Sequence, residues 1–321
     1  MLNGIYIKNL KRKTLQPGLL FFSFLFLTFP SYGVDHMINE KYLFSFKTNK
    51  STCILRVNDI PAIENTLVYS GTISAGFNAS AMLGNGSNSI ELLMGGQDTD
   101  DPKTLFPDSS CELVVSKDTK DLHTEIARFK LTVNEKHKIT ARESSHYDGG
   151  TYSSKIIEGD AINNRSYHYD NGLYKLSSNL IVHDLPLWTW EKATPVTEKD
   201  LPMIRKAYEK IWWMMQRRDI DGLKEIAKIS SSEMAYAEGT TTGMMFVSTD
   251  FPAHVLDKSL TPVPIDWNHY KLMTYNHGRL FRMGVGYFQN SPLRFQNSKG
   301  KIVYTYRPYF SIINGQVVLV R

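Results

Sequence analysis

Hydrophobic residues recur along this chain with two different periods. In the first half, short runs rich in β-branched and aromatic residues alternate with turn clusters of Gly, Asn and Asp, and this pattern predicts many short strands. The runs are LFSFK, CILRV, TISAGFNASAML, SIELLM, CELVVS, IARFKLTV, HKITARE, SKIIEG and GLYKLSSNLIV. We therefore expect residues 34–182 to form an all-β sandwich of antiparallel sheets.

The second period is helical and lies between Thr197 and Ser230. Apolar residues recur there at steps of three and four, which places them on one stripe of a helix. They are Leu201, Ile204, Tyr208, Ile211 and Met215, with Ala207 and Trp212 beside them. Thr197 and Asp200 form a variant capping box, and Pro202 fits the first helical turn. A short second helix is expected after the Asp219–Gly222 turn.

Paired apolar runs after residue 270 predict hairpins, because Asn and Gly between such runs favour tight turns. The three turns are Asn276-His277-Gly278, Asn297-Ser298-Lys299-Gly300 and Asn314-Gly315. Between the helices and these hairpins, we expect Gly239–Trp267 to be an irregular connection.

Two segments resemble known families. The long helix, the Asp turn with Leu-x-x-Leu from Asp219 to Ile226, and the hairpins resemble the cone-shaped α+β fold of the nuclear-transport-factor-like superfamily. This resemblance covers residues 197–321 and implies a long helix packed on a curved antiparallel sheet with a pocket at its open end. FNASAMLGNGSNSIELLM resembles the strand–turn–strand of jelly-roll and immunoglobulin-like accessory modules, which bind sugars or proteins or act as spacers. The expected fold class is two-domain, a β-sandwich followed by an α+β cone.

The N-terminal segment and the linker between the two expected domains complete this organisation. Residues 1–33 have a basic start, an apolar core and small residues at the expected cleavage point, which is typical of a signal peptide. A membrane anchor is the rival interpretation, but the apolar core is short for a span. Residues 183–196 are the expected linker and contain Trp188 and Trp190. These indoles either pin the two domains together or, if exposed, form an aromatic platform for sugar rings.

Removal of the expected signal segment changes the net charge and leaves both cysteines in the chain. The net charge is +5, but Lys8, Lys11, Arg12 and Lys13 lie in the signal segment, so 33 basic residues face 32 acidic ones after cleavage. This balance does not favour nucleic-acid binding. In an exported protein, Cys53 and Cys111 are expected to form a disulfide. We therefore expect a periplasmic or extracellular protein without a stable membrane anchor.

Candidate binding residues fall in two groups. Aromatic and arginine side chains on the predicted strands suit a carboxylate or sugar ligand in the cone pocket, and the alternative is that the tyrosines are core and the arginines face outward. They are Tyr275, Arg279, Arg282, Tyr304 and Tyr306, with Arg307 and Tyr309 nearby. The irregular connection either presents anchors to a protein partner or closes the mouth of the cone. Its large side chains are Met244, Met245, Phe246, Phe251 and Trp267.

Catalytic and metal-binding patterns are weak. His254, Asp266, His269 and His277 are the acid–base candidates near the pocket. The Tyr/Asp site and Asp base used by isomerases of the cone superfamily cannot be placed on this sequence. Asp98, Asp100 and Asp101 have the spacing of oxygen ligands for calcium, but the prolines that follow favour a solvated loop. We assign no catalytic residue, metal or cofactor.

Three function classes remain open. The first is a non-catalytic exported binding protein, in its sharper form an immunity protein that neutralises a secreted antibacterial effector, because the two-domain arrangement is similar to that of some periplasmic inhibitors. The second is an envelope enzyme that uses the cone pocket. The third is a glycan-binding or assembly module that uses the β-sandwich. The absence of catalytic motifs favours the first class, with a protein as partner and a glycan or small molecule as the alternatives.

Overall fold

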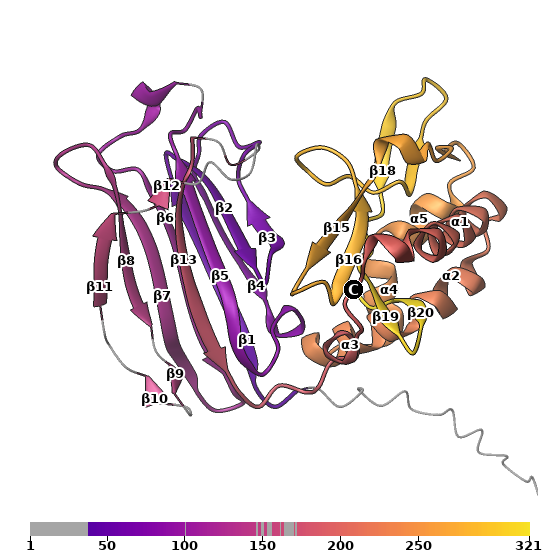
Figure 1. Ribbon diagram of the computed structural model, residues 1–321, viewed down its shortest axis with the longest axis horizontal. Helices are drawn as coiled ribbons and strands as arrows, with labels where there is room; N and C mark the ends of the chain where they lie inside the picture. Colours follow the sequence, from indigo (N-terminus) through magenta and orange to yellow (C-terminus); the bar gives the residue numbers. More distant parts are fainter. Residues whose placement is uncertain are drawn as a thin grey trace, which may run out of the picture. The chain divides into compact units, whose positions relative to one another are not determined.

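Two antiparallel β-sheets dominate the first half of the chain (Figure 1). The computed structural model describes residues 38–99, 101–145, 147–148, 151–152, 156–160, 162–163, 170 and 172–321. The expected signal segment, 1–33, and Asp100 lie outside the described residues. Side chains in the first strand alternate between buried and more exposed, and Tyr42, Phe44 and Phe46 face the core. This two-residue period is the one that predicted the strands.

Each sheet is built from strands that are distant in sequence. The six-stranded sheet has the order β11 (Ile156–Asp160), β8 (Ile139–Ser145), β7 (His123–Val133), β6 (Ser110–Asp118), β1 (Lys41–Asn49) and β4 (Ile73–Asn78). The five-stranded sheet has the order β12 (Ile162–Asn163), β13 (Tyr174–Val182), β5 (Gly86–Gly95), β2 (Thr52–Val57) and β3 (Ile60–Glu64). A short hairpin joins β9 (Tyr147–Asp148) to β10 (Thr151–Tyr152). One hydrophobic core contains side chains from both large sheets.

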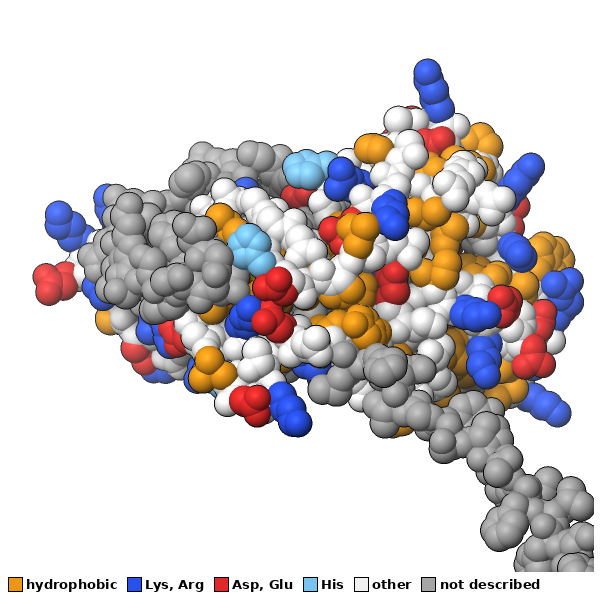
Figure 2. Space-filling model, turned by 90° about the horizontal axis from the view of Figure 1, so that it is seen from below, with side chains coloured by type: hydrophobic (Ala, Val, Ile, Leu, Met, Phe, Trp, Pro, Cys, Tyr) orange, Lys and Arg blue, Asp and Glu red, His pale blue; other side chains and the backbone are white. Residues whose placement is uncertain are grey.

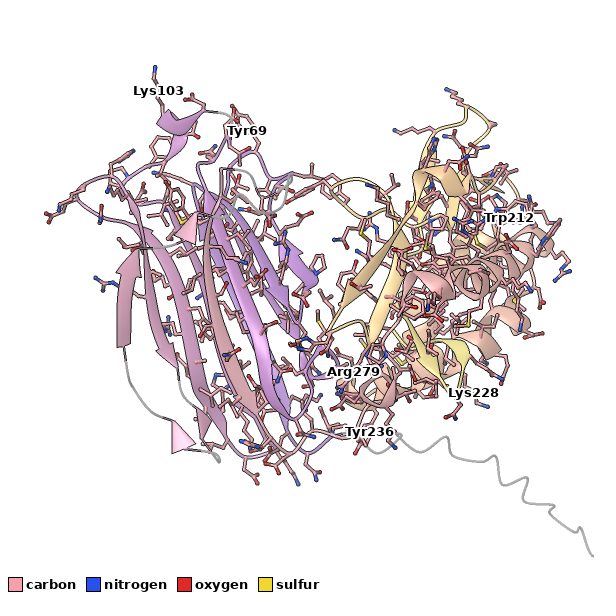
Figure 3. All side chains as sticks on the ribbon, viewed as in Figure 1. Tyr69, Lys103, Trp212, Lys228, Tyr236 and Arg279 are labelled. Atoms are coloured by element: carbon pink, nitrogen blue, oxygen red, sulfur yellow. A yellow bond between two sulfur atoms is a disulfide. The ribbon has the colours of Figure 1, made fainter. Side chains whose placement is uncertain are left out.

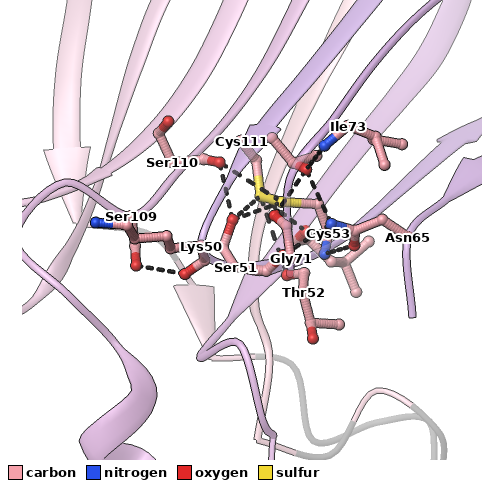
Figure 4. The surroundings of a disulfide bond; sticks show 12 residues. Lys50, Ser51, Thr52, Cys53, Asn65, Gly71, Ile73, Ser109, Ser110 and Cys111 are labelled. Carbon is pink, nitrogen blue, oxygen red and sulfur yellow. Dashed lines mark hydrogen bonds between the residues drawn. A yellow bond between two sulfur atoms is a disulfide. The ribbon is translucent and has the colours of Figure 1, made fainter. Parts of the chain in front are cut away.

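The predicted disulfide is present and joins the two sheets. Cys53 lies in β2 and Cys111 lies in β6, and their Cα atoms are 6.0 Å apart. The surroundings in Figure 4 are well hydrogen-bonded, since Asn65 Oδ1 accepts from the Cys53 backbone N–H at 2.7 Å and Ser51 Oγ donates to the Ser110 carbonyl at 2.8 Å. The bond therefore connects strands that no backbone ladder connects.

Strand β3 was not predicted, and its position explains why. Pro61 interrupts its pattern, and proline cannot donate to a ladder. The strand lies at the edge of the five-stranded sheet, where this loss is tolerated. The preceding turn, Asn58-Asp59, is one of the Gly, Asn and Asp clusters that predicted turns, and both residues have positive φ, at 51° and 68°.

Helix α1 (Leu201–Arg217) confirms the predicted stripe. Ile204, Tyr208, Ile211 and Met215 are buried, whereas Lys206 on the other side is exposed. Asp200 Oδ2 accepts from the Thr197 backbone N–H at 2.8 Å, as expected for a capping box, and the box closes a short 3₁₀ turn (Glu198–Asp200) that leads into the helix. Arg218, with φ of 56°, ends the helix.

The stretch after α1 contains more helix than predicted. The short second helix is α2 (Ile220–Ile226), which Asp219 caps by accepting from the Gly222 N–H at 2.9 Å. Helix α3 (Lys228–Glu238) follows it and was missed. The expectation of an irregular connection from Gly239 to Trp267 is wrong, since this stretch contains α4 (Thr242–Ser248) and α5 (Phe251–Leu256). Both helices are too short for a clear periodic signal, and tertiary burial of Phe246 and Phe251 stabilises them.

The predicted hairpins form, but they are divided between two sheets. The four-stranded sheet contains β15 (Lys271–Tyr275), β16 (Leu280–Gly284), β19 (Phe310–Ile313) and β20 (Gln316–Leu319). The three-stranded sheet contains β14 (Thr261–Pro262), β17 (Arg294–Gln296) and β18 (Ile302–Thr305). The whole is a β-rich α+β fold, and the single curved sheet implied by the cone resemblance is replaced by these two smaller sheets.

Trp188 and Trp190 lie in the expected linker and are both buried. Trp188 Nε1 donates to the carbonyls of Leu83 at 3.0 Å and Ser80 at 3.2 Å, and both indoles belong to the same buried cluster as Ala237. This burial is what the pinning interpretation requires, and the sugar-platform interpretation, which required exposed indoles, is wrong. The described residues from Ile38 onward form one compact unit, so the division into two domains stays a prediction. Among the described helices, none has the length and apolar character needed to cross a membrane.

Candidate binding site

A cavity of about 400 Å³ lies where helices α3 and α4 meet the segment after β18. Its wall includes Met234 from α3, Met245 and Phe246 from α4, and Tyr304 and Tyr306. The β-rich half adds Ile60 and Pro61 of β3 and the short turn Ser80–Met82. The wall is mainly apolar, and the volume of the cavity lies within the range of small-ligand pockets.

Helix α4 is placed by a cap and by one core side chain. Thr241 Oγ1 accepts from the Met244 N–H at 3.2 Å, which fixes the first turn. Phe246 is only 5% exposed and belongs to the core that surrounds α1. Met245 is half-buried at the cavity wall, and Met244 is 64% exposed. Three adjacent residues of this short helix therefore lie in different environments: Phe246 in the core, Met245 at the cavity and Met244 at the surface.

Stacked aromatic rings support the opposite wall. The rings of Phe251 and Tyr306 stack with centroids 4.0 Å apart, and the His254 ring stacks on Tyr304 at the same distance. Tyr304 Oη donates to the Thr249 carbonyl at 2.6 Å, which ties β18 to the residue after α4. Burial raises the pKa of both Tyr304 and Tyr306 above the ordinary value of 10.0 for a phenol.

Arg321 adds a buried cation to the apolar wall. Its side chain is 8% exposed, and Nη1 donates to Glu233 Oε2 at 2.5 Å. Nε donates to the Ala81 carbonyl at 2.9 Å, and the guanidinium lies 5.1 Å from the centre of the Trp188 ring. Burial lowers the pKa of Arg321, while Glu233 and Glu191 oppose this shift.

A second arginine is buried behind the cavity. Arg282 Nε donates to Tyr275 Oη at 3.1 Å, and Nη2 donates to Gln289 Oε1 at 2.7 Å. The guanidinium lies 4.6 Å from the centre of the Tyr309 ring, and Tyr309 lines the cavity. Arg282 and Tyr275 therefore support Tyr309 from behind and do not themselves line the wall.

The predicted binding residues are thus divided among several places. The cavity brings together Met245, Phe246, Tyr304 and Tyr306 from both predicted groups. Arg279 is exposed next to β16 (Figure 3). Trp267 lies against α1, where its Nε1 donates to Glu209 Oε1 at 3.1 Å and its ring is 6.1 Å from that of Tyr208.

The acid–base candidates are held in separate local contacts. His254 Nδ1 lies 2.8 Å from the Asp250 carbonyl, and His269 Nε2 lies 3.7 Å from Asp266 Oδ2 within one turn. His277 occupies the exposed β15–β16 turn. Within the described ranges, no three His, Cys, Asp or Glu side chains come close enough to hold a metal ion. Asp98 and Asp101 lie in a loop that Thr104 closes, since its Oγ1 lies 2.9 Å from the Asp98 carbonyl oxygen and 2.7 Å from the Asp101 carbonyl oxygen.

A second, more open hollow of about 790 Å³ lies at the loop end of the large sheets. Tyr69 and Phe106 line it beside the polar side chains of Gln97 and Thr99. Tyr69 is 96% exposed, and Figure 3 shows it at the same end of the sheets as Lys103.

Several cavity residues carry no signal in the sequence. Ile60, Met82 and Leu280 look like ordinary core residues, and only the packing of distant segments places them at one wall. Arg321 looks like a surface cation. Its burial depends on Glu233, which lies 88 positions earlier in the chain.

Comparison with protein families, curated proteins and solved structures finds no match to this chain. The resemblances to the cone superfamily, to accessory sandwich modules and to two-domain immunity proteins therefore stay predictions.

Proposed function

We propose that this chain is a non-catalytic binding protein that uses the α3–α4 cavity to hold an apolar group of its partner. One observation carries the proposal. Four residues that the sequence predicted as binding residues in two separate segments line one mainly apolar cavity of about 400 Å³; they are Met245, Phe246, Tyr304 and Tyr306. Concave, mainly apolar pockets with a few polar groups are the usual form of small-ligand binding sites.

A protein is the partner class that the surroundings favour. Met244 and Val247 of α4 and Ile302 and Val303 of β18 are exposed, and these two elements also supply the wall. The hydrogen bond from Tyr304 to Thr249 holds the two elements together. Exposed apolar side chains on the elements that line a pocket suit a protein partner that inserts one large side chain and also contacts these elements.

Export completes the proposal. The expected signal peptide and the disulfide are consistent with a periplasmic or extracellular location. On the face shown in Figure 2, basic and acidic side chains are interspersed, and hydrophobic side chains emerge between them. The sharper form of the proposal is an immunity protein that occupies a secreted antibacterial effector.

The test uses two serines of α3. Ser230 lines the cavity, whereas Ser232 is exposed on the same helix. The full chain should capture a protein from envelope extract of its own host, Ser230→Phe should lose that protein, and Ser232→Phe should retain it. Co-expression should also protect cells from the captured protein. Equal capture by all three chains would place the interface elsewhere.

The open hollow at the loop end of the sheets supports a second candidate, glycan binding by the β-rich half. An almost fully exposed tyrosine beside amide and hydroxyl groups is the composition of a sugar-binding surface. Binding to a glycan array should then be lost in Tyr69→Ala and kept in Lys103→Ala. An array without any bound glycan would remove this candidate.

A further inference from the structure

A small crevice of about 180 Å³ lies between α1 and the segment that follows β14. We call it the tryptophan crevice, and the residues that line it are Glu209, Trp212, Trp213, Pro264, Ile265 and Trp267. It shares no lining residue with the α3–α4 cavity, so a ligand bound here is separate from the partner proposed for that cavity.

Every tryptophan of the chain that is not buried lines the tryptophan crevice. Of the five tryptophans, Trp188 and Trp190 are each only 1% exposed. In contrast, Trp213 is 56% exposed on α1, and Trp212 and Trp267 are half-buried. Large apolar rings gathered at one hollow of the surface are informative, because such groups are usually buried unless they contact a ligand or a partner.

The indoles form a corner rather than a flat surface. The rings of Trp212 and Trp213 meet at 79°, and their centres are 5.1 Å apart. Trp212 Nε1 donates to the Val263 carbonyl at 2.7 Å, and Trp267 Nε1 donates to Glu209 Oε1 at 3.1 Å. These two N–H donors are used within the chain, which leaves the aromatic carbon atoms of the rings for contact with a ligand.

The charges around the crevice favour a cation as that ligand. An aromatic ring attracts a cation over its electron-rich face, at up to roughly 6 Å from the ring centre. The chain itself makes such a contact here, since the Arg205 guanidinium carbon lies 5.5 Å from the centre of the Trp267 ring. Arg205 does not line the crevice, whereas Glu209, its neighbour one helical turn later, does. The Glu209 carboxylate therefore offsets Arg205, and Trp213 has the most exposed ring for a second cation.

We propose that the tryptophan crevice binds a methylated ammonium group, with Trp213 as the main aromatic contact and Glu209 as the opposite charge. Methyl groups on the ammonium contact the indoles, whereas a primary ammonium is strongly hydrated and would lose that hydration in the crevice. The volume is below the roughly 300 Å³ at which pockets for larger ligands begin, and it suits a head group of this size. Free choline-like solutes and the head group of phosphatidylcholine both carry this group.

Three small probes that differ in charge and methylation test the proposal. Choline carries a trimethylammonium group, 3,3-dimethylbutanol is its neutral carbon analogue, and ethanolamine carries a primary ammonium. Binding to the full chain is measured by the indole N–H NMR signals, of which those of Trp212, Trp213 and Trp267 should shift. The buried Trp188 and Trp190 supply the reference signals. We expect choline to bind at least about fivefold more tightly than either of the other probes.

Two variants separate the aromatic contact from the charge. Trp213→Leu keeps an apolar side chain, so the affinity for choline should fall about fivefold while that for 3,3-dimethylbutanol stays within about twofold. Glu209→Gln keeps an acceptor for Trp267 Nε1 but removes the charge, and the affinity for choline should fall about threefold. Glu198→Gln is the control, since it removes the same charge from the exposed turn before α1.

Vesicles distinguish the two sources of the methylated ammonium group. Binding to phosphatidylcholine vesicles but not to phosphatidylglycerol vesicles, with loss in Trp213→Leu, would identify a lipid head group. Binding of choline without binding to either kind of vesicle would identify a soluble cation.

Other outcomes overturn the proposal in distinct ways. Equal affinities for choline and 3,3-dimethylbutanol would show an apolar crevice that does not recognise charge. Equal affinities for choline and ethanolamine would show a carboxylate site in which the indoles play no part. If no probe shifts the three indole signals, the crevice is not a cation site. None of these results bears on the proposed function, because other residues line the α3–α4 cavity.

Discussion

Three tyrosine side chains of this protein, Tyr208, Tyr306 and Tyr309, are shielded from water by the surrounding chain. Tyr208 is fully buried on α1, and its Oη accepts from the Met283 N–H at 2.9 Å. Burial raises the pKa of Tyr208, Tyr306 and Tyr309 above the ordinary value of 10.0. Each of these phenols therefore keeps its proton in the folded protein at a pH where the unfolded chain has lost it.

We expect the free energy of unfolding to fall as the pH rises above about 10. Above this pH the unfolded state binds fewer protons than the folded state, so stability decreases with pH by up to about 1.4 kcal/mol per unit for each such tyrosine. Below about 10 this contribution is fully present. Denaturant unfolding at several pH values, together with phenolate absorbance, measures the effect. Full ionisation of the tyrosines in a protein that stays folded would contradict it.

At the scale of elements, α1 organises the helical half. Its buried stripe shares one core with α4, α5 and both small sheets. Trp212 Nε1 on the same helix donates to the Val263 carbonyl at 2.7 Å, and this bond holds the segment after α5. The short helices have little intrinsic stability and depend on this core.

Ile211→Asp should therefore destabilise the protein by about 3–5 kcal/mol, because Ile211 is buried mid-stripe and a carboxylate there has no partner. Lys206→Asp on the exposed face of α1 should change stability by less than about 0.5 kcal/mol. Denaturant unfolding measures both, and hydrogen exchange should locate the loss in residues 197–321. Equal effects of the two substitutions would mean that the stripe is not the buried face.

At the scale of the whole molecule, the segment between β13 and α1 connects the two halves. Trp188 and Trp190 share a cluster with Ile60 and Ala81 from the β-rich half and with Val320 from the end of the chain. Asn78 Nδ2 donates to the Ala237 carbonyl at 2.8 Å, and Lys41 Nζ donates to the Glu238 carbonyl at 2.9 Å. The cavity wall depends on these contacts, since both halves contribute to it.

We expect the protein to unfold in one transition and Trp188→Ala to divide it into two. The substitution should cost about 3–5 kcal/mol, because it removes a large indole from a core and leaves two carbonyls without their donor. Trp213→Ala is the control, since Trp213 is 56% exposed. Calorimetry distinguishes the outcomes, and two transitions in the unsubstituted protein would show that the halves are already independent.

The sequence by itself determined the local structure and one long-range bond. The two-residue and helical periods identified most strands of the β-rich half, the buried face of α1 and the three hairpins, because these patterns depend on neighbouring residues. The disulfide followed from an isolated pair of cysteines in a chain expected to be exported.

Only the tertiary structure decided where the short helices form and which side chains share a cavity. Helices α4 and α5 are stabilised by packing rather than by their own period, so the sequence predicted an irregular connection there. The cavity wall combines Ile60, Met234, Met245 and Tyr306, and most of the chain lies between Ile60 and Tyr306. Side chains of the same type lie in different environments according to what packs against them. On α4, Met245 lines the cavity and Met244 is exposed. Arg321 is buried because Glu233 pairs with it, and no local pattern encodes that pairing.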